Sequence, residues 1–217
     1  TLAGSGVELV QCSNLVDAIW EDQPAPPMEP AKAHPIKFAG ETHLDKRTRL
    51  AHNLGEAGEK AAVITLPDSI CWLLNTRGAD IERNPVVHAF AVLQADGSVD
   101  LFSEPSKYET LADHLGNDIR LYPPGGFLIA LAELDGPVRI DTSTVPQIVA
   151  DTLGDRAVGG AEPCALSKAC KNAAEVEGAA QAHLRDGAAM VEMLCWMDDQ
   201  AVDSLTESKV VRQLEET

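Results

Sequence analysis

Aromatic side chains are scarce in this chain of 217 residues. They make up 4% of the sequence, whereas hydrophobic residues as a whole make up 45%. Any core must therefore be filled by alanine, valine, leucine and isoleucine. Such an aliphatic mixture suits layered α/β domains. The length is sufficient for one large domain, or for one domain and part of another.

Positive charge is also scarce, with 17 lysine and arginine residues against 34 aspartate and glutamate residues and a net charge of −17. This balance argues against nucleic acid and an anionic membrane surface as partners, because both repel an acidic chain. An acidic, solvated surface explains the charge. No apolar run approaches the roughly 20 residues that cross a bilayer, and we expect no signal peptide. We therefore expect a cytoplasmic protein.

Cysteines are few and widely spaced. Their number is odd, no two form a CxxC pair, and no histidine stands at zinc-ligand spacing from them. We expect reduced thiols, most of them buried as small apolar groups. They are Cys12, Cys71, Cys164, Cys170 and Cys195.

Side chains that bind metal ions do not converge in the sequence. His43 and His52 are nine positions apart, about 900° of helical rotation, and so lie on opposite faces of their helix. His183 and Asp186 are three apart and are typical of a solvated pair on a helix. No serine-protease signature, phosphate-binding loop or dinucleotide fingerprint is present. We therefore assign no catalytic residue and no metal ligand to this chain.

The first thirty residues resemble the end of one domain followed by a linker. The segment from residue 1 to 20 reads as the end of an element whose beginning lies upstream. Residues 23–30 contain four prolines, which favour extended polyproline-II geometry and a semi-rigid linker. We expect a folded α/β unit from residue 34 to about 160, with this stretch outside its core.

Helix and strand patterns alternate along that unit, which implies a layered α/β domain. The Asp-Gly pair at 96–97 predicts the tight turn of an antiparallel hairpin between strands at 86–93 and 99–102. Further strands are expected at 61–65, 119–121, 138–140 and 156–158. Helices are expected at 41–54, 69–75, 108–115, 126–134 and 145–153.

The first of these helices has a clear apolar pattern. Leu44, Leu50, Ala51 and Leu54 fall on one face. Gly55 stands where a left-handed C-terminal cap is expected. We therefore predict that this face is buried and that the helix ends at residue 54.

A long helix-forming run at 173–197 suggests a second domain. Gly178 and Gly187 weaken this helix by up to ~1 kcal/mol each, a cost that is usually tolerated where another backbone packs closely. Thr206 is expected to cap a last helix that runs to the end of the chain.

Three segments, in order, resemble the three-domain Xaa-Pro aminopeptidases of the creatinase/prolidase family. The first resembles the family's junction between first and second domains, the second a segment of the middle domain, and the third the first helix of the catalytic domain. They are Asn14-Leu-Val-Asp-Ala-Ile-Trp-Glu-Asp-Gln-Pro-Ala-Pro-Pro27, the segment from Asp68 to Val86, and Lys168 to Gly178 continued by Ala182 to Ala189.

The resemblance implies three parts in this chain. Residues 1–30 would be the end of a preceding domain and a Pro-rich linker. Residues 31–162 would be a ribonuclease-H-like α/β middle domain of the creatinase N-terminal type. Residues 163–217 would be the first helices of a truncated pita-bread catalytic domain.

The resemblance also implies an activity for the parent protein. It would be a metallopeptidase that releases the N-terminal residue from peptides with proline in second position. Two metal ions, usually manganese, would be bridged by two Asp, one His and two Glu, and such a pair generates hydroxide near neutral pH. These ligands would lie downstream of residue 217. We therefore expect this chain alone to be inactive and to bind no manganese.

The loop from Arg77 to Asn84 is expected to face the active site of the parent enzyme. The forked donors of Arg77 suit a peptide carboxylate or carbonyl group. The alternative is that Arg77 pairs with Asp80 or Glu82 and simply holds the loop.

Other functional readings remain open. The chain can instead be a non-catalytic interaction or dimerisation module of a pseudo-enzyme, and the downstream ligand set would decide. Creatinase-like hydrolysis of a small amidino substrate is a third reading, disfavoured by the proline-rich junction. Helices from Ala173 onward would pack against a second copy or be mobile, so we expect a homo-oligomer.

Overall fold

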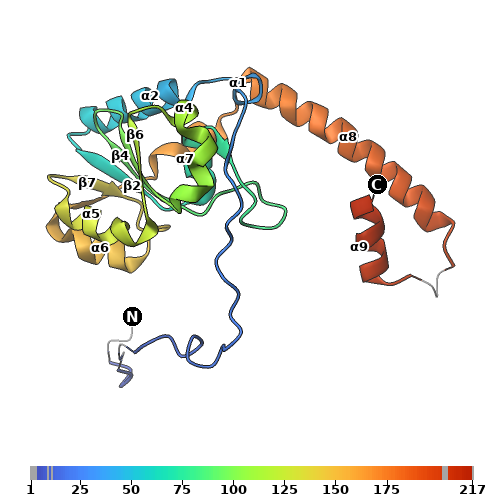
Figure 1. Ribbon diagram of the computed structural model, residues 1–217, viewed down its shortest axis with the longest axis horizontal. Coiled ribbons are helices and arrows are strands. Elements are labelled where there is room, and N and C mark those ends of the chain that lie inside the picture. Colours follow the sequence, from blue (N-terminus) through green and yellow to red (C-terminus); the bar gives the residue numbers. More distant parts are fainter. Residues whose placement is uncertain (1–3, 9, 11, 202–204, 217) are drawn as a thin grey trace.

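The computed structural model describes residues 4–8, 10, 12–201 and 205–216. Its centre is a six-stranded sheet in the order β6-β5-β4-β2-β7-β8 (Figure 1). β4 runs antiparallel to both of its neighbours, and the other pairs are parallel. The strands are β2 (Ala61–Ile64), β4 (Phe90–Gln94), β5 (Val99–Phe102), β6 (Ile119–Tyr122), β7 (Val138–Ile140) and β8 (Ala157–Gly159).

Helices cover both faces of this sheet, and each face has its own apolar cluster. One face carries α2 (His43–Glu56), α3 (Pro67–Leu73), η1 (Pro105–Leu111), α4 (Ala112–Leu115) and α7 (Pro163–Ala169). The other carries α5 (Phe127–Glu133) and α6 (Gln147–Leu153). The short elements are α1 (Ile36–Ala39), the 3-10 turns η2 (Pro124–Gly126) and η3 (Gly154–Arg156), and the pair β1 (Lys32–Ala33) and β3 (Thr76–Arg77).

The central strand β2 shows why the layers form. Its side chains alternate, so that Ala62 and Ile64 join one cluster while Ala61 and Val63 join the other. All four residues are buried, as expected where both faces of a sheet are covered. The layered α/β architecture predicted from the sequence is confirmed.

The hairpin is present, but its first strand is shorter than predicted. Gly97 has a φ of 86°, and the Gln94 N–H donates to the Ser98 carbonyl at 2.9 Å. The strand β4 begins only at Phe90. Two residues before it bond to Asp80 instead: the Val86 carbonyl accepts from the Asp80 N–H, and the His88 N–H donates to the Asp80 carboxylate.

The helix α2 ends later than expected. Gly55 lies inside the helix, and the left-handed conformation falls at Gly58, with a φ of 73°. Leu44 is 52% exposed and does not belong to the buried face. His43 is half-buried in the same turn, with its ring 5.1 Å from that of His114.

The proline-rich segment 23–30 has no helix or strand, and nearly all of it is exposed. Packing begins immediately after it, where Ala31 is buried and its N–H donates to the Lys107 carbonyl at 2.8 Å. At the other end the core continues into α7, because the Cys164 side chain is fully buried in it. The limits at residues 30 and 162 stay predictions, and the packed unit itself extends past residue 162.

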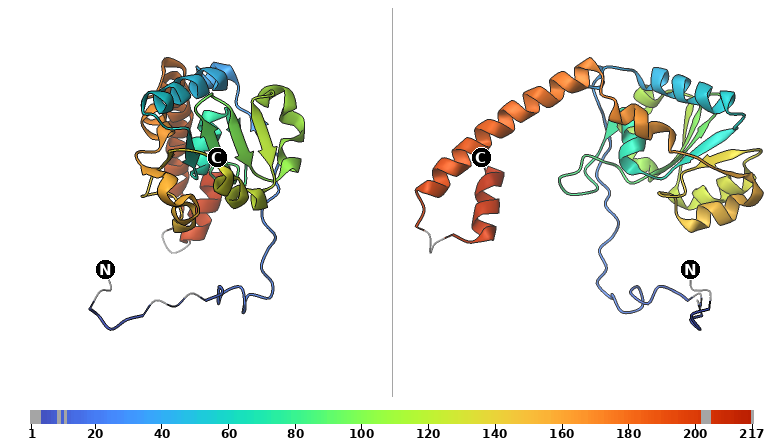
Figure 2. Two further views of the ribbon diagram at one scale, coloured as in Figure 1. Left: turned by 90° about the vertical axis from the view of Figure 1, so that its left-hand side faces the viewer. Right: turned by 180° about the vertical axis from the view of Figure 1, so that it is seen from behind.

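Two helices extend from this body. α8 (Ala173–Asp198) leaves it as a long arm, and α9 (Glu207–Glu216) folds back beside α8 (Figures 1 and 2). The helix predicted at 173–197 is confirmed. No close approach of another backbone accompanies Gly178 or Gly187: in the part of the chain that the structure describes, a Cβ at either position meets nothing within 4 Å.

The cysteines are free, as expected, but most of them are not buried. Cys71 and Cys164 lie in the core, whereas Cys12, Cys170 and Cys195 are exposed. The exposed three lie in the N-terminal segment, after α7 and on α8, where no apolar layer covers them. The expectation that most are buried is wrong.

Candidate functional site

A pocket of about 300 Å³ lies where α3, the loop after β3, α7 and the first turns of α8 meet. Arg77 and Asn84, the two residues that sequence reasoning singled out, both line it. The other polar residues that line it include Lys168, Lys171 and Glu175. The structure therefore brings the two predicted residues into one concave site.

Arg77 is held by backbone carbonyl groups. Its Nη1 donates to the carbonyl oxygen of Thr76 at 2.8 Å and to that of Cys71 at 3.3 Å. Burial lowers the pKa of Arg77 from its usual value, although a guanidinium remains protonated under all ordinary conditions. The side chain is thus a fixed cation at the wall of the pocket.

The alternative partners expected for Arg77 are wrong. Asp80 pairs with Lys107 at 2.6 Å, and both of these side chains are almost fully buried. Glu82 lies 3.8 Å from Arg83 in an exposed pair. The loop is therefore held by the Asp80–Lys107 pair, and Arg77 takes no part in it.

Asn84 lies at the exposed turn of the same loop. Its N–H donates to the Ile81 carbonyl at 3.1 Å, and the intervening Arg83 has a φ of 63°. Within the described residues, the side-chain amide of Asn84 has no hydrogen-bond partner. It is free to bind a group that enters the pocket.

Two lysines come from the α7 end of the pocket. Lys168 pairs with Asp68 and lies 3.3 Å from the Ser69 hydroxyl. Burial alone would raise the pKa of Asp68, but the hydrogen bond and charge of Lys168 hold it below its usual value. Lys171 donates to the Lys168 carbonyl at 2.6 Å. Lys168 is thus paired with a carboxylate, whereas the hydrogen bond of Lys171 goes to a backbone carbonyl.

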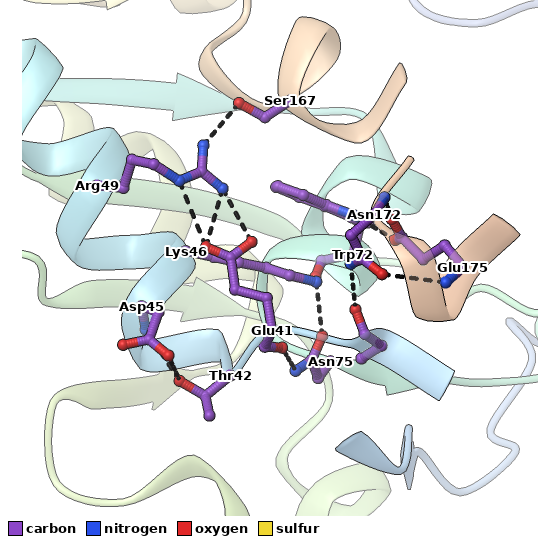
Figure 3. A network of polar contacts seen from close by, with 11 residues as sticks. Glu41, Thr42, Asp45, Lys46, Arg49, Trp72, Asn75, Ser167, Asn172 and Glu175 are labelled. Atoms are coloured by element: carbon purple, nitrogen blue, oxygen red, sulfur yellow. Dashed lines mark hydrogen bonds and ion pairs between the residues drawn. The ribbon is translucent and has the colours of Figure 1, made fainter. Parts of the chain in front are cut away.

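A buried polar network stands behind the pocket (Figure 3). The Trp72 indole N–H donates to Glu175 at 3.2 Å. Beneath the ring, Lys46 Nζ lies 4.2 Å from its centroid and donates to the Trp72 carbonyl at 3.0 Å and to Asn75 at 2.8 Å. Lys46 is 1% exposed, and burial lowers its pKa to about 8.

The first turn of α8 is attached to this network by a capping box. The Glu175 N–H donates to the Asn172 side chain at 3.0 Å, and the Asn172 N–H donates back to the Glu175 carboxylate at 2.9 Å. Asn172 also donates to the Ala39 carbonyl at 2.8 Å. A Cβ at Gly40 would lie 2.3 Å from Asn172 Oδ1, so only glycine allows this approach.

A second group of contacts ties α2 to the same corner. Glu41 accepts from Asn75 through its carbonyl at 2.9 Å and from Arg49 through its carboxylate at 2.9 Å. Arg49 in turn donates to the Ser167 hydroxyl of α7 at 3.0 Å. Residues of α1, α2, α3, α7 and α8 therefore meet in one hydrogen-bonded corner, which positions the pocket.

Metal-binding side chains do not gather in the described part of the chain. No group of three or more His, Cys, Asp and Glu residues there is arranged to hold an ion. His43 contacts the His114 carbonyl at 2.8 Å, and His52 lies 3.4 Å from Glu56. The described residues therefore do not fit a metal pair, and no helix among them is long and apolar enough to span a bilayer.

Sequence reasoning missed the network and both lysines. One signal was available, since Lys46 stands four and eight positions before Leu50 and Leu54 and therefore shares their buried face. A cation on an apolar face indicates a buried partner. The Trp72–Glu175 contact joins residues 103 positions apart, and no local pattern reveals it.

The chain matches the family model of the creatinase/prolidase N-terminal domain over residues 22–175. It belongs to this family. Curated relatives in it are probable Xaa-Pro aminopeptidases P: that of Laccaria bicolor is 36% identical over 86% of this chain, and that of Coccidioides posadasii (strain C735) 34% identical over 95%. These alignments cover 30% and 34% of the relatives' own length, so the chain spans about a third of them.

Solved structures agree with this assignment. An X-prolyl aminopeptidase from Caenorhabditis elegans, described as a cytosolic enzyme with a di-nuclear active site, superposes with a TM-score of 0.90. It is 26% identical, and the match covers 99% of this chain and 37% of that one. A Xaa-Pro dipeptidase from Bacillus anthracis superposes with a TM-score of 0.62 and is 14% identical. The match covers 81% of this chain and 48% of the dipeptidase chain, which shows a common fold. The creatinase N-terminal type of α/β fold is confirmed.

Proposed function

We propose that this chain is the creatinase N-terminal domain of a metal-dependent Xaa-Pro aminopeptidase, followed by the first helices of its catalytic domain. The parent enzyme would release the N-terminal residue from peptides with proline in second position. The observation that carries this proposal is the similarity to probable Xaa-Pro aminopeptidases P along 95% of the chain. The shared fold with an X-prolyl aminopeptidase supports it.

Several finer points belong to the same proposal. The parent would carry two metal ions, manganese by preference, on ligands outside the described residues. It would act in the cytoplasm, as the neighbour from Caenorhabditis elegans does. The pocket that holds Arg77 and Asn84 would face the substrate, since both residues meet beside the first turns of α8.

A non-catalytic dimerisation module is the second candidate. It is favoured by apolar side chains that α8 exposes along its length, because such residues suit an interface between copies. On this reading the protein would form a homo-oligomer through the arm. The exposed residues are Val176, Leu184, Met190, Val191 and Leu194.

A comparison of this chain with the longer protein that contains it separates the two candidates. The enzyme reading predicts that the longer protein binds Mn²⁺ in calorimetric titration and cleaves an Xaa-Pro peptide, and that this chain alone does neither. A longer protein that binds no divalent ion and cleaves no peptide, yet dimerises in sedimentation, would establish the second candidate instead.

A further inference from the structure

The pocket beside α8 has an unusual charge for this protein. The chain as a whole carries a net charge of −17, yet three cations, Arg77, Lys168 and Lys171, line the pocket against two carboxylates, those of Asp68 and Glu175. A local excess of positive charge on an acidic protein attracts anionic groups to that position.

Both carboxylates already have donors. One oxygen of Glu175 accepts from the Trp72 indole and the other from the Asn172 N–H. Asp68 is paired with Lys168. Asp68 is thus matched by Lys168, whereas Glu175, whose donors are neutral, still acts on Arg77 through its charge. Three cations against two carboxylates leave the pocket with one net positive charge.

Donor capacity is left over on three side chains. Arg77 uses one nitrogen, Nη1, for both of its carbonyl acceptors. Lys171 makes a single bond, to the Lys168 carbonyl. In the described part of the chain, Arg77 Nε and Nη2 and the Asn84 amide have no acceptor. A planar anion that enters the pocket would find three donor groups there: the guanidinium of Arg77, the ammonium of Lys171 and the amide of Asn84.

Apolar groups complete the walls. Trp72, Pro85, Val86 and Ala179 line the same pocket, and its volume of about 300 Å³ is at the lower end of the range for small ligands. The arrangement suits a small ligand that has an apolar body and one anionic end.

We propose that this pocket binds the carboxylate of a peptide, with Arg77 and Lys171 as the charged contacts and Asn84 as a third donor. This inference rests on the proposed function, which makes a peptide the ligand. The carboxylate is either the free C-terminus of a short substrate or the side chain of an acidic residue within it. The enzyme would therefore prefer peptides that carry this charge.

Kinetics of the longer protein test the preference. Three peptides that share the same Xaa-Pro start are compared: an Xaa-Pro-Ala acid, its C-terminal amide, and the Xaa-Pro-Glu amide. We expect kcat/KM to be about tenfold or more higher for a charged peptide than for the neutral amide, as for a charge-assisted hydrogen bond. The charged peptide with the larger increase in kcat/KM shows whether the carboxylate is the C-terminus or the glutamate side chain.

Substitutions assign the effect to the pocket. Arg77→Gln and Lys171→Gln should each bring the ratio of acid to amide close to one, mainly through KM. Arg120→Gln is a matched control, since Arg120 pairs with Asp100 outside this pocket, and it should leave the ratio unchanged. Because Arg77 also holds two carbonyl groups, the exposed Lys171 provides the variant that leaves folding intact.

The indole N–H signal of Trp72 in a nitrogen–proton NMR spectrum provides a readout independent of activity. Its chemical shift should change and reach a plateau as the peptide acid is added. It should not change when the amide is added. If the longer protein cleaves all three peptides equally well and the signal does not move, the carboxylate site is refuted and the proposed function stands. If nothing is cleaved, the proposed function fails, and the NMR titration still decides the pocket.

Discussion

The helices of the α/β body and those of the α8–α9 arm have similar helix-forming sequences, but they differ in what buries their apolar residues. In the body, Leu50 and Leu54 of α2 are almost fully buried against the sheet. On the arm, Leu184 and Val191 are largely exposed, and Met193 is the buried residue of α8. Periodicity therefore determines that a helix forms in both regions, whereas burial, and with it stability, depends on residues far away in the sequence.

The largest expected effect lies in the buried ion pair of the body. Lys107→Met should destabilise the protein by about 3–5 kcal/mol, because it leaves Asp80 buried without a countercharge. The comparable change on the arm is Glu215→Met in α9, which breaks the exposed pair with Arg83 of the body and should cost at most ~1 kcal/mol. Urea unfolding measures both. Equal costs would contradict the distinction between the two regions.

Truncation of leucine should show the same contrast in apolar packing. Leu54→Ala removes a fully buried side chain and should cost about 2–5 kcal/mol. Leu184→Ala, at a position that is 67% exposed, should change stability by no more than ~0.5 kcal/mol. A large loss of unfolding free energy in Leu184→Ala would show that the arm is packed in solution.

The buried Lys46 predicts a pH dependence of stability. Its folded-state pKa of about 8 lies below the usual value of 10.5, so the unfolded chain binds more protons between these two values. The contribution of Lys46 to the free energy of unfolding therefore rises with pH across that window, by about 1–3 kcal/mol. Below pH 8 the cost of burying the charged form is fully present. The difference between wild type and Lys46→Met, measured by urea unfolding from pH 7 to 10.5, should show this rise. A flat difference would contradict it.

A smaller loss than in the buried positions of the body is expected where the first turn of α8 is attached to the body. Asn172→Ala removes both the capping box and the bond to Ala39 and should cost about 0.5–2 kcal/mol. Amide hydrogen exchange should become faster in the first turns of α8, with no change in β2 or β4. Faster exchange throughout the sheet would show that the joint supports the whole body.

Local signals account for the parts of the fold that were predicted. The Asp-Gly turn at 96–97 fixes the hairpin because its positive φ is a local requirement, and α8 follows from a helical period sustained along its whole length. Val86 was wrongly placed in a strand because its carbonyl bonds to Asp80 in the same loop. The pairing of β1 with β3 was missed because it joins distant two-residue strands.

The candidate site was less accessible to sequence reasoning. Arg77 and Asn84 were found through a family resemblance, and their meeting in one pocket is a property of the fold. Lys171 and Glu175 come from segments about 90 residues further along the chain. Their contribution depends on how α7 and α8 dock on α3, which no periodicity encodes.

The proline preference of the longer protein is the most direct test of the central claim. It is measured as the ratio of kcat/KM for two peptides that differ only in having proline or alanine in second position. The account predicts that the longer protein cleaves the proline peptide efficiently and the alanine peptide at least tenfold less well, and that a chelator abolishes both activities. Equal cleavage of the two peptides, or cleavage that survives removal of divalent ions, would contradict it.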